Sequence, residues 1–209
     1  MTKLGAPSDR LQPIRDLGIE ALECNQRLED FNKSTDLYQS FSKTTGIPVF
    51  LSPLRDEGLE KRTHGHVFSH LIRAGFFVDE LSEHSTWMKN MVSTDCLAGV
   101  VVRHEFQDDL VFAAEHCASW ARACQCKIQL SIKTAASSTV VLNDDTERLS
   151  ELTKLALELS SKYPELFFVF DTFADIDRGY YPRFGFIDGH FNLRPAAQTW
   201  QKMVAASSH

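Results

Sequence analysis

Apolar runs of strand length alternate along this chain with segments of helical periodicity. A strand in a parallel sheet is buried on both faces, so it reads as a continuous apolar run, as residues 166–170 do here. The alternation predicts an α/β protein with a mainly parallel sheet built from βα units. Strands are expected near residues 19–24, 47–51, 76–79, 97–103, 126–132 and 166–171.

The clearest helical pattern covers Thr146–Lys162. Leu149, Leu152, Ala156 and Leu159 recur at spacings of three and four residues, which places them on one face of a helix. The same reasoning predicts further helices over residues 34–44, 67–74, 85–92, 108–123 and 195–204.

Chain length limits how many βα units the fold can hold. A complete (β/α)8 barrel needs about 250 residues, whereas this chain has 209. We therefore expect one domain over residues 1–209 that is TIM-barrel-like but shortened or incomplete, with an open sheet as the alternative. The sequence contains no GxGxxG or Walker motif, so it gives no support to a nucleotide-binding fold.

Composition narrows the classes of partner. The formal net charge of −6 argues against a protein that coats nucleic acid. The longest apolar runs have the length of strands, and the first residues hold no apolar stretch of signal-peptide length. Five cysteines are an odd number, which suits reduced thiols. We expect a cytoplasmic protein without a membrane partner and without a cofactor.

Polar residues follow several of the expected strands. Glu23, the pair Asp79 and Glu80, the pair His104 and Glu105, and Asp171 each stand where an apolar run ends. In parallel α/β folds the carboxyl ends of the strands face the functional site. These residues therefore predict a shared polar pocket at one rim of the sheet. The alternative is that each is a solvated strand end or a helix cap.

The segment 167–197 resembles the last strand and closing helix of the clan A (β/α)8 glycoside hydrolases. The resemblance rests on Gly185-Phe186-Ile187-Asp188 and on Arg194-Pro195-Ala196-Ala197. It implies a barrel-like fold and a carbohydrate ligand. Within the segment, the loop residues Asp171, Asp175, Arg178 and Tyr180 are expected to contact the sugar. The alternative is that this loop only supports the fold.

The same resemblance implies two catalytic carboxyl groups. Asp79-Glu80 is similar to the strand-four motif that carries the general acid, and Arg103-His104-Glu105-Phe106 is similar to the motif that carries the nucleophile. Glu80 is thus expected to act as acid and Glu105 as nucleophile or base, with His104 near the substrate. If the strand over 126–132 is instead the penultimate one, its end at Thr134 has no carboxylate. The chain would then bind sugar without cleaving it.

Two further interpretations remain open. His66 and His70 share a possible helix face, but solvated histidines are the simpler reading, and no metal is expected. The strand-end residues Glu23, Asp79, His104 and Glu105 also resemble, more distantly, the cation ligands of sugar-isomerase barrels. Finally, an unfinished barrel leaves sheet edges that a second copy or a partner chain would cover.

Overall fold

The structure is a computed structural model that describes residues 21–56, 72–105, 108–133 and 146–170, with 193, 197–199, 201, 202 and 205. The strands in this part are β1 (Leu22–Gln26), β2 (Val49–Asp56), β3 (Ile72–Ala74), β4 (Gly99–His104), β5 (Lys127–Ile132) and β6 (Leu166–Phe170). The helices are α2 (Leu28–Lys33), α3 (Thr35–Thr45), the 3-10 helix η1 (Val78–His84), α4 (Ser85–Ser93), α5 (Leu110–Cys124) and α6 (Thr146–Lys162).

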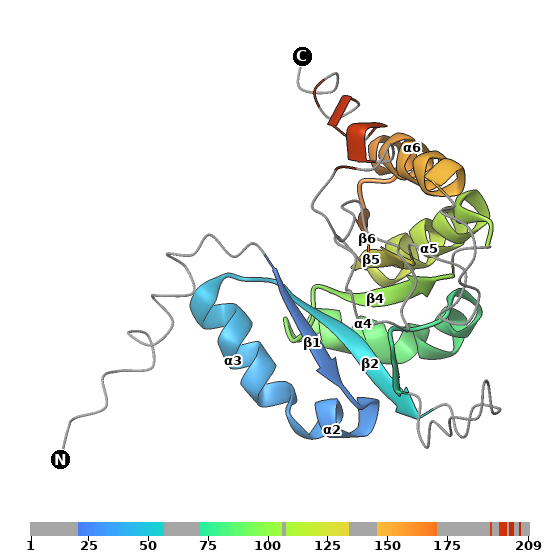
Figure 1. Cartoon of the computed structure of the whole chain (residues 1–209). Helices are drawn as coiled ribbons and strands as arrows, with labels where there is room; N and C mark the ends of the chain where they lie inside the picture. Colours follow the sequence, from blue (N-terminus) through green and yellow to red (C-terminus); the bar gives the residue numbers. More distant parts are fainter. Residues whose placement is uncertain are drawn as a thin grey trace, which may run out of the picture.

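The strands form a sheet in the order β1-β2-β4-β5-β6, and these five strands are all parallel (Figure 1). Helices connect them, as parallel neighbours require. The predicted α/β fold with a parallel sheet of βα units is therefore confirmed. The described strands do not close into a barrel, which agrees with the expectation of a shortened or incomplete one.

Strands β2 and β4 separate toward their carboxyl ends. They pair at Phe50 with Gly99 and at Leu51 with Val100. Farther along, Phe76 forms a parallel bridge with Val102 of β4. Strand β3, which ends two residues before Phe76, pairs antiparallel with β2. A short segment thus lies between β2 and β4 at the carboxyl-terminal edge of the sheet.

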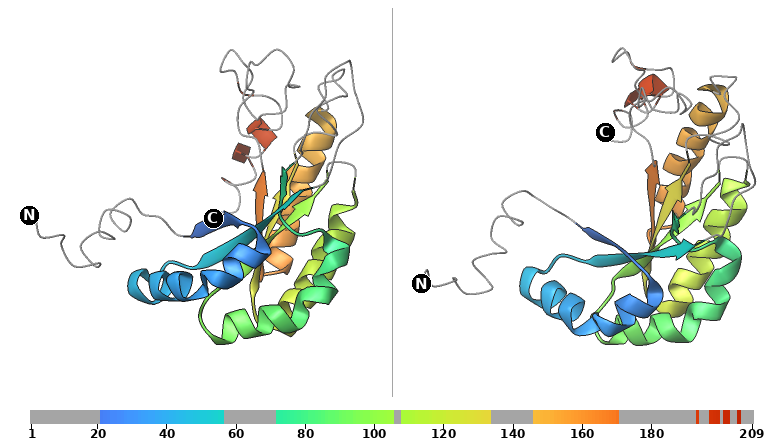
Figure 2. Two further views of the ribbon diagram at one scale, coloured as in Figure 1. Left: turned by 90° about the horizontal axis from the view of Figure 1, so that it is seen from below. Right: turned by 60° about the horizontal axis from the view of Figure 1, so that its bottom comes forward.

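The sheet is curved, and the helices lie on its outer side (Figure 2). Two contacts cross its concave face between strands that are not neighbours. Gln129 of β5 donates a hydrogen bond of 2.8 Å to Glu23 of β1. The ring of Phe50 of β2 lies edge-on to that of Phe167 of β6, with 5.9 Å between the centroids. The sheet therefore curls as part of a barrel wall does.

The main core lies between the sheet and the outer helices. Alternate side chains of each strand point into it, and helices α4, α5 and α6 supply the facing side chains. The strand contributions include Val100, Val102, Ile128, Leu130 and Ile132. The strand residues between these positions face the concave side instead, because successive side chains of a strand alternate between faces.

Gly99 allows a close packing contact on the concave face. A Cβ atom there would lie 2.1 Å from the carbonyl oxygen of Lys127 and 2.7 Å from a ring carbon of Phe50. The absence of a side chain thus lets the Phe50 ring rest on the backbone of β4.

Most expected elements are present, with two corrections. Ile72–Ala74, expected in a helix, is strand β3, and of the strand expected at 76–79 only the bridge at Phe76 forms before η1 begins. The short helix α2 was not predicted. The expected helix over 195–204 lies only partly within the described residues.

No helix in the described ranges combines the length and hydrophobicity that crossing a membrane requires.

Candidate functional site

Strand β4 ends in three residues with different surroundings. Val102 and His104 point toward the helices, whereas Arg103 points to the concave face, in register with Ser131 of β5. Glu105 follows the strand, and its carboxylate pairs with Arg103. The charged groups therefore gather on the concave side, at the carboxyl-terminal edge of the sheet.

Arg103, Glu105 and Lys133 form an ion-pair cluster, here called the Glu105 cluster. Arg103 Nε lies 2.6 Å from Glu105 Oε1, and Lys133 Nζ lies 2.9 Å from Glu105 Oε2. The three side chains are 16%, 29% and 26% exposed, respectively. Each oxygen of the carboxylate therefore has its own cation in a partly buried setting.

These cations determine the ionisation of Glu105. Burial alone would raise the pKa of its carboxyl group, but the hydrogen bonds and charges of Lys133 and Arg103 outweigh that effect. The net result is a pKa below the ordinary value of 4.5. At neutral pH Glu105 is an anion, so it suits a nucleophile or a base and not an acid.

Glu80 lies in η1, which begins directly after the segment that joins β4. Its Oε2 accepts a hydrogen bond of 3.0 Å from the backbone N–H of Phe77, so the side chain caps its own helix. Because Phe76 pairs with Val102, the segments that carry Glu80 and Glu105 leave the sheet side by side. The structure thus brings these two segments to the same edge.

His104 is placed differently from its neighbour. It is 1% exposed and points toward the helix layer, away from the Glu105 cluster. In the described part of the chain, neither ring nitrogen has a hydrogen-bond partner. Burial lowers the pKa of the imidazole below its ordinary value of 6.5, which nearby Asp108 only partly opposes. His104 is therefore a neutral histidine on the opposite face from the carboxylate beside it.

The remaining strand-end carboxylates also take separate positions. Glu23 was expected to follow a strand, but it lies within β1. Its carboxylate accepts a hydrogen bond from Gln129 on the concave face. The exposed Asp79 belongs to η1. Among the described residues, no three His, Cys, Asp or Glu side chains gather as metal ligands would.

The other predicted sugar contacts, Asp171, Asp175, Arg178 and Tyr180, lie outside the described residues. So do His66 and His70.

Sequence reasoning missed Arg103 and Lys133 as members of the site. Arg103 stands two residues before Glu105, a spacing that shares one face of a strand. Lys133 stands directly after β5, the strand adjacent to β4. Both signals exist in the sequence, but using them requires knowing that these two strands are neighbours in register.

Comparison of the chain with protein-family models and with curated proteins finds no match.

Proposed function

We propose that this chain acts on a carbohydrate at the carboxyl-terminal edge of its concave sheet face, as a glycoside hydrolase. In this proposal Glu105 is the nucleophile or base, and Glu80 is the general acid. Asp171, Asp175, Arg178 and Tyr180 hold the sugar. The resemblance of residues 167–197 to the clan A glycoside hydrolases supports this proposal.

One observation carries the proposal: an ionised carboxylate on the concave side, directly after a parallel strand. In folds of this type, the loops after the strands hold the functional groups. Hydrolysis of a glycosidic bond uses a carboxylate that remains charged beside a carboxylic acid that delivers a proton. Glu105 has the properties of the first group.

The variant Glu105→Gln tests the assignment. A panel of nitrophenyl glycosides first identifies a substrate of the wild type. We expect the variant to hydrolyse it at least about a hundredfold more slowly, because an amide neither attacks nor accepts a proton. Glu83→Gln is the matched control, since Glu83 is an exposed glutamate of η1. Equal rates for Glu105→Gln and the wild type would refute the role of Glu105.

Glu80→Gln tests the acid. Nitrophenolate leaves with little protonic help, so this variant should lose more activity on alkyl glycosides than on nitrophenyl glycosides. The same loss on both classes would contradict the acid role of Glu80.

Binding without hydrolysis is the second candidate function. Both oxygens of Glu105 are engaged by cations, which lowers their reactivity as nucleophiles. A wild-type chain that binds the glycosides and releases no nitrophenolate would support this candidate.

A further inference from the structure

The Glu105 cluster contains hydrogen-bond donors that are not used to bind the Glu105 carboxylate. Arg103 reaches Glu105 through Nε, and among the described residues its two terminal amino groups, with four N–H groups, have no partner. Lys133 has three N–H donors on its ammonium group and uses one for Glu105. Ser131 stands in register with Arg103 and adds a hydroxyl on the same face. Several donors therefore remain on this part of the concave face.

The charges of the cluster do not balance. Within the cluster, two cations surround one carboxylate, which leaves one positive charge in a chain whose overall charge is −6. Glu23 also lies on the concave face, but its carboxylate accepts a hydrogen bond from Gln129 and is not one of the groups paired with Arg103 or Lys133. The three side chains are at least about two-thirds buried, so solvent screens them less than exposed groups. A ligand with one negative charge would neutralise the cluster.

Arginine is suited to such a ligand. Its two terminal amino groups form a planar fork that matches the two oxygens of a carboxylate or sulfate. A neutral sugar hydroxyl would take up donors without balancing the charge. The donors and the unbalanced charge thus point to the same class of ligand.

We propose that the Glu105 cluster binds a sugar that carries one negative charge, a uronate carboxylate or a sulfate ester, through Arg103 and Lys133. The inference rests on the proposed carbohydrate function and names the substrate class for that site. The anionic group lies beside Lys133, and the sugar ring extends over the concave face.

The experiment measures affinities of the full chain by calorimetry for two probes that differ in one group. Methyl β-D-glucuronide carries a carboxylate where methyl β-D-glucoside carries a hydroxymethyl group. We expect the glucuronide to bind at least about tenfold more tightly, as one hydrogen-bonded ion pair implies. Glucose 6-sulfate forms a third arm, which distinguishes a sulfate ester from a carboxylate as the preferred anion.

Three variants separate the cluster from general effects of charge. Lys133→Met should weaken glucuronide binding about tenfold, because one of two cations is lost. Lys127→Met is the matched control, because it also removes one lysine charge. Lys127 lies at the start of β5, at the opposite end from Lys133, and donates a hydrogen bond to the backbone carbonyl oxygen of Pro164. Its affinity should equal that of the wild type. Glu105→Gln should bind the glucuronide more tightly, because it removes the competing carboxylate.

The outcomes distinguish this inference from the proposed function. If the glucoside binds as tightly as both anionic sugars, the preference for an anion is wrong, while a carbohydrate function stands. If Lys127→Met weakens binding as much as Lys133→Met, the cluster is not the anion site. If none of the three sugars binds, the inference is overturned, whereas the function proposed above is decided separately by its nitrophenyl glycoside assay.

Discussion

At the scale of single residues, the neighbours His104 and Glu105 have side chains on opposite faces of the sheet, and different surroundings set their pKa values. His104 points into the helix layer and Glu105 pairs with cations on the other side. Both have a lowered pKa, but for different reasons: burial disfavours the charged imidazolium, whereas Lys133 and Arg103 favour the charged carboxylate.

The two residues therefore affect stability in different pH ranges. Because the pKa of His104 is lower in the folded state, the unfolded state binds a proton more readily. The free energy of unfolding should decrease as the pH falls from about 6.5 toward the folded-state pKa. Glu105 should contribute a second decrease below pH 4.5, as its carboxylate becomes protonated and loses its ion pairs.

Urea unfolding at pH 7.5 and 5.5 tests the contribution of His104. His104→Leu should lose less of its stability between these two pH values than the wild type does, because the residue that must become charged is gone. His116→Gln is the control, since His116 is exposed on α5. A wild type and a His104→Leu variant with the same pH dependence would contradict the explanation.

At the scale of elements, local patterns were sufficient where an element has its own strong signal. The observed bounds of α6 and β6 are those the sequence indicated, because a leucine stripe defines the helix and a continuous apolar run defines the strand. For the candidate site, the sequence located Glu105 at a strand end and Glu80 on a segment that reaches the same edge, but it did not identify the two cations that pair with Glu105.

Elements that depend on distant partners could not be predicted. Strand β3 exists because it pairs antiparallel with β2, and no local pattern carries that information. Strand β1 was expected to end near Glu23, but Glu23 and Asn25 are concave-face residues that alternate with the buried Cys24. Polar residues on an exposed sheet face thus interrupt the apolar pattern, and the sequence then predicts the end of a strand where the strand continues.

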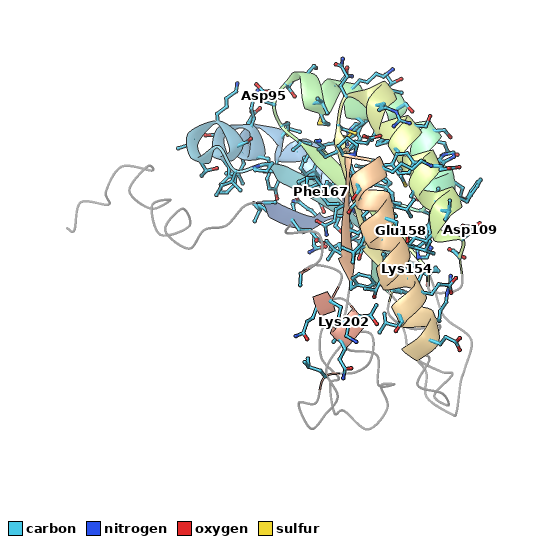
Figure 3. All side chains as sticks on the ribbon, turned by 90° about the horizontal axis from the view of Figure 1, so that it is seen from above. Asp95, Asp109, Lys154, Glu158, Phe167 and Lys202 are labelled. Atoms are coloured by element: carbon cyan, nitrogen blue, oxygen red, sulfur yellow. The ribbon has the colours of Figure 1, made fainter. Side chains whose placement is uncertain are left out.

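The start of α5 depends on one side chain, Asp109 (Figure 3). Its Oδ1 accepts hydrogen bonds from the backbone N–H groups of Val111, at 2.9 Å, and Phe112, at 3.1 Å. Asp109→Ala should lower the free energy of unfolding by about 1 kcal/mol in urea. Asp109→Asn keeps an oxygen that can cap the helix, so it should lower the free energy of unfolding by only a few tenths of about 1 kcal/mol. An alanine variant as stable as the asparagine variant would show that the cap contributes nothing.

At the scale of the whole molecule, the sheet curls around the concave face on which the Glu105 cluster lies. Glu23 and Gln129 are 106 residues apart in the chain and still form a hydrogen bond across the concave face. Phe167 lies on β6 next to helix α6 (Figure 3), and it is 49% exposed although its ring contacts Phe50. The sequence predicted a parallel, barrel-like sheet, but it could not predict which side chains meet across the concave face, because these contacts join residues that are distant in the chain.

The most direct test of the account is the location of a bound sugar on the folded chain. Amide chemical shifts of the isotope-labelled protein are followed while cellobiose, mannobiose and methyl β-D-glucuronide are added in turn. We expect the largest changes, for at least one of these sugars, at Arg103, Glu105 and Lys133. Changes confined to the outer helices, or no change with any of the three sugars, would contradict this expectation.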